Sequence, residues 1–152
     1  MRRSRTILAV LVLPLLTAPV YAMGSDDHQP NEQSITELQQ KIQTAHPREQ
    51  CYLYAELIHE MTEMSIQQYA AGNSNKGNAL LQRVQELTHK LHKTVSDDDK
   101  RLKKAEILLR HTVFRLSEML HDTGYQDRKV VAKTLQSVSQ ADNDAMLQVF
   151  KK

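Results

Sequence analysis

The chain has 152 residues, of which 40% are hydrophobic and 25% charged, with one cysteine and a formal charge of +2. Residues 1–22 hold three of the 20 basic residues and none of the acidic ones, so the remaining 130 residues carry 17 basic residues against 18 acidic ones. A nucleic-acid-binding domain is expected to be net basic, so this class of function is not favoured. The remaining length is sufficient for one domain with its own core.

The N-terminal segment has the pattern of a secretory signal peptide. Three arginines precede an apolar run at residues 7–16, and the small residues Val20 and Ala22 follow two positions apart. This pattern predicts cleavage after Ala22. The run is shorter than the roughly 20 residues that span a bilayer. We therefore expect no stable membrane anchor after cleavage, and a periplasmic or secreted protein.

After the signal peptide, residues 23–33 are polar and aperiodic, which predicts a flexible leader. A single α-helical domain is then expected over residues 34–152. Ser34 and Glu37 have the spacing of a capping box, so we expect a short helix from Ser34 to about Ala45. Pro47 should end it and open the next helix, because proline fits the first helical turn.

The rest of the domain shows helical periodicity without strand alternation. Long helices are expected over about 47–71, from the end of a 72–78 turn to about 95, over 103–123, and from about 128 to the C-terminus. Asp142 lies within the apolar stripe of the last helix, so we expect a break near residues 142–144 rather than a buried carboxylate.

Short connections between these helices predict antiparallel neighbours. The fold class is therefore all-α: an antiparallel helical bundle of two long helical hairpins plus a short N-terminal helix. Tyr69-Ala-Ala-Gly72 leading to Ala79 resembles a tetratricopeptide-type hairpin. The helices are too long for that repeat and its Trp-Leu-Gly signature is missing, so the resemblance implies hairpin geometry alone.

The segment 103–123 is the most apolar stretch after the signal peptide, and we expect it to be the central helix. One face carries the main apolar stripe, formed by Ala105, Leu108, Leu109, Val113, Leu116, Met119 and Leu120. The opposite face carries Ile107, His111, Phe114, Glu118 and His121. This second face has apolar residues flanked by titratable ones, which is typical of an interface with a polar rim. Either the 34–45 helix covers it, or it is a partner surface, together with Tyr52, Glu56 and His59 of the second helix.

Two histidine patterns raise the alternative of a metal- or cofactor-binding bundle. Glu56/His59 and Glu118/His121 have the Glu-x-x-His spacing of di-iron bundles, but helical periodicity turns both pairs away from the core. His89 and His92 are spaced to share a copper or zinc ion, although no third ligand is identifiable.

Cys51, the single cysteine, lies near the edge of an apolar stripe, which favours a half-buried thiol. No catalytic motif is present in the sequence. The expected function is therefore that of an exported, non-enzymatic protein–protein interaction module without a cofactor. Its partner would be another protein or a second copy of the chain.

Overall fold

The computed structural model describes residues 30–94 and 99–151. The signal peptide predicted at residues 1–22 and the 23–29 part of the leader lie outside this range. The described residues form five α-helices and no strand, which confirms the all-α fold class. The helices are α1 (Glu32–Thr44), α2 (Pro47–Ala70), α3 (Ser74–His92), α4 (Asp99–Asp122) and α5 (Arg128–Val149).

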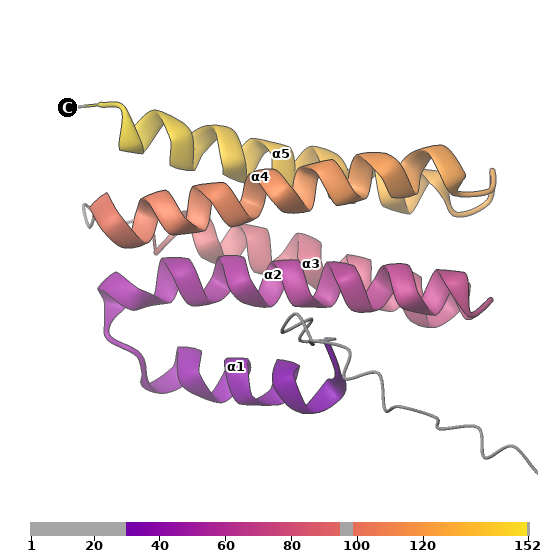
Figure 1. Cartoon of the computed structure of the whole chain (residues 1–152), viewed down its shortest axis with the longest axis horizontal. Helices are drawn as coiled ribbons and strands as arrows, with labels where there is room; N and C mark the ends of the chain where they lie inside the picture. The colour runs from indigo at the N-terminus through magenta and orange to yellow at the C-terminus, as the bar shows by residue number, and fades with distance from the viewer. Residues whose placement is uncertain (1–29, 95–98, 152) are drawn as a thin grey trace, which may run out of the picture.

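The four long helices form two antiparallel hairpins, α2 with α3 and α4 with α5, which pack against each other (Figure 1). The contacts between the hairpins join α2 to α4 and α3 to α5. Both α2 and α4 run in one direction, and α3 and α5 return in the other (Figure 1). Within the described residues α3 and α4, although consecutive in the chain, are not neighbours. The first helix of one hairpin therefore lies beside the first helix of the other.

The helix with most neighbours is α2 rather than α4. It packs against α1, α3 and α4, whereas α4 contacts α2 and α5 within the described part of the chain. The expectation that segment 103–123 is central was therefore wrong. High apolar content identified a helix with a well-formed core face, but it did not show how many helices surround it.

The core is continuous through all five helices. The apolar stripe expected on α4 faces inward, since Ala105, Leu109 and Leu116 are fully buried. Leu57, Ile58 and Met61 of α2 are also buried, as are Val131 and Val138 of α5. At about 25 cal/mol per Å² of apolar surface removed from water, this shared core is the main source of stability.

The first helix begins earlier than the sequence suggested. Asn31 is the N-cap residue: its side chain accepts a hydrogen bond from the Ser34 backbone N–H at 2.9 Å. The Ser34 hydroxyl in turn lies 3.2 Å from the Asn31 backbone nitrogen, which completes a capping box. The predicted box of Ser34 with Glu37 was therefore wrong by one helical turn. Asn and Ser are both good capping residues, and local pattern did not separate them.

The predicted turn at 72–78 is shorter than expected. It ends before Ser74, and Gly77 is a buried residue within α3. A Cβ atom at Gly77 would lie 2.5 Å from the ring of Tyr69, so glycine lets α2 and α3 approach closely here. Only Gly72 has a positive φ among the described residues, at 77°, and it supplies the reversal of the chain.

The expected break at residues 142–144 is absent, because α5 is continuous from Arg128 to Val149. Asp142 is instead half-buried, and its buried Oδ1 atom has no hydrogen-bond partner among the described residues. Burial raises the pKa of this carboxyl group, while the charge of Arg110 opposes the shift. The cost of one poorly solvated carboxylate was smaller than the cost of interrupting the helix.

None of the described helices is both long enough and apolar enough to cross a membrane.

Candidate interaction surface on α4

The outer face of α4 is the surface formed by Ile107, His111, Phe114, Glu118 and His121. All five side chains are exposed. Ile107 is 56% exposed and Phe114 58% exposed, and both belong to the large hydrophobic side chains that are exposed in the described structure. They are seven residues apart, so they lie on the same face of the helix two turns from each other.

The short helix α1 does not cover this face. It packs on α2, on the side away from α4 (Figure 1), and its Ser34 hydroxyl contacts Glu60 of α2. The alternative in which the 34–45 helix covers the second face of α4 was therefore wrong. Leu38 and Ile42 find their apolar partners on α2 and leave the outer face of α4 open.

On α2, the residues proposed to extend this surface are only partly accessible. Tyr52, Glu56 and His59 are each half-buried. Burial, and then the charge of Glu56, raise the pKa of the Tyr52 phenol. The His59 ring lies 5.2 Å from the His111 ring, centroid to centroid, with the planes tilted by 43°. His59 therefore belongs to the α2–α4 junction, and His111 marks the point where the junction meets the outer face of α4.

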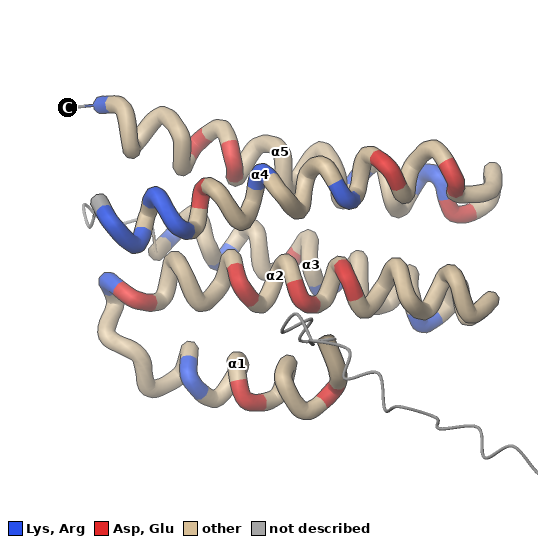
Figure 2. Tube along the Cα trace, in the orientation of Figure 1, with Lys and Arg blue, Asp and Glu red and all other residues tan. Residues whose placement is uncertain are grey.

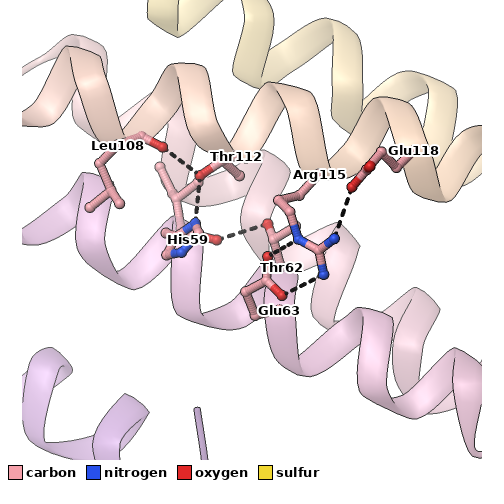
Figure 3. A network of polar contacts seen from close by, with 8 residues as sticks. His59, Thr62, Glu63, Leu108, Thr112, Arg115 and Glu118 are labelled. Atoms are coloured by element: carbon pink, nitrogen blue, oxygen red, sulfur yellow. Dashed lines mark hydrogen bonds and ion pairs between the residues drawn. The ribbon is translucent and has the colours of Figure 1, made fainter. Parts of the chain in front are cut away.

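The protonation of His59 follows from its hydrogen bonds (Figure 3). The Thr112 hydroxyl donates its single proton to the Leu108 carbonyl oxygen at 2.8 Å. The Nδ1 atom of His59 lies 3.0 Å from the same hydroxyl oxygen, so Nδ1 must be the donor in this contact. Burial lowers the pKa of His59, which favours the neutral ring with its proton on Nδ1. The arrangement orients His59 and ties α2 to α4.

A second polar contact between α2 and α4 involves Arg115 of α4 (Figure 3). Its guanidinium donates to both carboxylate oxygens of Glu63, at 2.7 and 3.0 Å, and to Glu118 at 2.9 Å. The hydrogen bond with Glu63 is the largest cause of a raised pKa for Arg115. A bidentate pair of this kind fixes both position and orientation. It holds the outer face of α4 in register with α2.

A shallow, open hollow of about 360 Å³ adjoins Ile107 at the α2–α4 junction. Its lining residues are Tyr52, Lys104, Ile107, Leu108 and His111. The outer face of α4 thus combines projecting apolar side chains with a recess of mixed apolar and polar character.

The residues considered for metal binding do not gather into one cluster in the described structure. His92 Nδ1 is 3.1 Å from Asp144 Oδ2 of α5, and His89 is exposed to solvent. The pair Glu118 and His121 is exposed on α4, while His59 faces Thr112. Among the described residues, no three His, Cys, Asp or Glu side chains converge on one point.

Cys51 is more deeply buried than the sequence indicated. Only 2% of it is exposed, and it is part of the core. Burial raises the pKa of its thiol to about 11. The thiol is therefore neutral at physiological pH and is a poor nucleophile.

Some residues near the surface were not singled out from the sequence. Lys103 and Lys104 precede Ile107 by one turn and are exposed. Their i−4 and i−3 spacing from Ile107 could have identified them as part of the rim. Arg115 has no comparable signal, because its partner Glu63 is 52 positions away in the chain.

Comparison of the chain with protein-family models, with curated proteins and with solved structures finds no match.

Proposed function

We propose that the chain is an exported cell-envelope protein that acts by binding another protein chain through the outer face of α4. The observation that carries this proposal is the exposure of Ile107 and Phe114, at 56% and 58%, on a single helix face. Burying two such side chains against a partner would remove apolar surface from water, which is the main driving force of association.

The surroundings of the two side chains support binding rather than catalysis. Exposed charged and titratable groups flank them, as in the polar rim of an interface. The nearby His59 is held by Thr112, and Arg115 is held by Glu63 and Glu118. These contacts favour a rigid, preformed surface. We propose accordingly that the protein is not an enzyme.

The proposed location rests on the sequence of residues 1–22, which has the three regions of a secretory signal. After cleavage behind Ala22, the helical domain would act in the periplasm or outside the cell.

The test is site-specific photo-crosslinking in cells that produce the full chain. A photoreactive side chain replaces Phe114 in one variant and Leu147 in the control. Leu147 is 57% exposed on α5, so the two positions match in accessibility. Protein adducts are expected at position 114 and not at position 147. Absence of adducts at 114, or equal adducts at both positions, would contradict the proposed surface.

Folding is monitored in parallel with Phe114→Glu. Because more than half of this side chain is already exposed, the thermal midpoint should change little. A large drop in the midpoint would mean that Phe114 acts in the fold rather than in binding.

A further inference from the structure

The exposed charges of α4 are separated by sign along the helix. Lys100, Lys103, Lys104 and Arg110 are exposed in its N-terminal half, and Glu118 and Asp122 are exposed near its C-terminal end. The charged positions of the helices are coloured in Figure 2. Ile107 lies between Lys104 and Arg110, and Phe114 lies between Arg110 and Glu118.

This order is symmetric about one point of the helix. Ile107 lies three residues before Arg110, and Phe114 lies three residues after the adjoining His111. Lys103 and Glu118 lie seven residues outside the same two positions. A two-fold axis through the 110/111 midpoint would therefore exchange Ile107 with Phe114 and Lys103 with Glu118. It would also place Arg110 of each copy opposite His111 of the second copy.

We propose that the occupant of the outer face of α4 is a second copy of this chain, with the two α4 helices antiparallel about that axis. Ile107 of each copy then faces Phe114 of the second copy, and Lys103 faces Glu118 of the second copy. This inference rests on the proposed function and names its partner.

Charge complementarity selects the antiparallel arrangement. A parallel pairing in register would place the lysines of one copy against the lysines of the second copy, and Glu118 against Glu118. Like charges brought together in this way oppose association. The antiparallel pairing brings the basic end of each α4 to the acidic end of the other, and makes two equivalent sets of contacts.

The hollow beside Ile107 is consistent with the same arrangement. It is lined in part by Tyr52, Ile107 and Leu108, and Phe114 of the second copy arrives next to Ile107. An aromatic side chain at this point would contact Tyr52 as well as the aliphatic residues. Residues of α2 and α4 would thus both contribute to the interface.

The interface is small. Each α4 has 24 residues and is roughly 36 Å long, and two large apolar side chains per copy flank the central Arg110 and His111. Interfaces of limited area with a polar rim are commonly weak or transient. We therefore expect dimerisation that depends on protein concentration.

The experiment is analytical ultracentrifugation of the chain over a concentration series. The unsubstituted chain should sediment as a monomer–dimer mixture. Phe114→Glu should weaken the dimer by about tenfold or more, whereas the matched control Leu147→Glu should leave it unchanged. A chain that stays monomeric at every concentration overturns the proposal, and so does a dimer that is indifferent to Phe114→Glu.

Charge reversal tests the antiparallel pairing. The Lys103→Glu variant and the Glu118→Lys variant should each form only a weak dimer with itself. In each homodimer, residues 103 and 118 of opposite copies carry charges of the same sign at both ends of the interface. Mixed in equal amounts, the two variants should form a heterodimer in which both pairs are again opposite in charge. Arg115 keeps its two contacts to Glu63 in Glu118→Lys, so the α2–α4 tie remains. Failure of the mixture to associate overturns this arrangement.

The failure of this inference can be told apart from that of the proposed function. If the chain is monomeric but the photoreactive group at position 114 still captures a different protein, only self-association is wrong. If the chain is monomeric and position 114 captures nothing, both are wrong.

Discussion

At the scale of single residues, polar groups in the interior of the protein are mostly satisfied by nearby backbone. Thr62 and Thr134 are fully buried, and each hydroxyl donates to the carbonyl four residues earlier, at 2.8 and 2.9 Å. Thr112 does the same and also accepts from His59. Asp142 differs, because one of its oxygens is buried without such a partner in the described part of the chain.

Asp142→Ala is therefore expected to stabilise the fold. The substitution removes a poorly solvated carboxylate and introduces the best helix former, for a gain of roughly 0.5–2 kcal/mol at neutral pH. Because burial raises the folded-state pKa, the native state holds more protons than the unfolded chain just above the ordinary pKa of aspartate. The ionised Asp142 therefore lowers the unfolding free energy progressively as pH rises from the ordinary pKa of aspartate through the raised folded-state pKa. In stronger acid the carboxyl group is protonated in both states, and this loss of stability disappears.

Urea denaturation at neutral and acidic pH measures this difference. The control is Asp144→Ala, two positions along the same helix, which removes the partner of His92. Asp144→Ala should not stabilise the protein. A fall in the urea midpoint for Asp142→Ala at neutral pH would show that the Asp142 carboxylate makes a favourable interaction.

The Cys51 thiol should react with thiol reagents only after unfolding. It is 2% exposed, and its pKa is raised to about 11, so both access and thiolate content are low. Labelling with a chromogenic disulfide should be slow in buffer and rapid in concentrated urea. Rapid labelling of the folded chain would place the thiol at the surface.

At the scale of helices, the α2–α4 contact positions the outer face of α4. Ala55 on α2 and Ala105 on α4 are small and fully buried. The contacts of Arg115 with Glu63 and of His59 with Thr112 add directional ties. Because these ties use the inward-facing residues of α4, its opposite face remains open.

Leu109 lies on the inward face of α4 and is fully buried. Leu109→Ala should cost roughly 2–5 kcal/mol of unfolding free energy, through lost burial and the cavity left behind. The control Lys103→Ala changes an exposed residue of the same helix and should cost less than about 0.5 kcal/mol. Equal denaturation midpoints for the two variants would contradict the assignment of the inner face.

At the scale of the whole molecule, the two hairpins leave α4 at one side of the protein, with α1 on the opposite side of α2 (Figure 1). A helix in this position has neighbours on its inner sides only. The outer face of α4 is thus open, whereas α2 packs against three helices in the described structure.

Export is tested on the whole molecule as well. If residues 1–22 form a cleaved signal peptide, protein recovered from the cell envelope should begin at Met23, as measured by intact mass and N-terminal sequencing. A protein that retains residues 1–22 and stays in the cytoplasm would contradict the proposed location.

Much of the secondary structure follows from local pattern. Pro47 opens α2 as expected, and the apolar stripe of α4 faces inward as its periodicity indicated. Both features depend on residues within a few turns of each other, which is the range over which helical periodicity and capping act. The same local rules placed the start of α1 late and predicted a break at Asp142, because they do not weigh a local preference against packing elsewhere.

The neighbours of each helix depend on contacts between distant parts of the chain. The pairing of Arg115 with Glu63, and of His59 with Thr112, joins residues more than 50 positions apart. The sequence by itself determined that α4 has two different faces and named the residues of each. Only the tertiary structure decided that α1 packs on α2 and leaves Ile107 and Phe114 exposed. The physical reason is that the apolar side chains of α1 can be buried against α2 or against α4, and the sequence pattern of α1 is compatible with both.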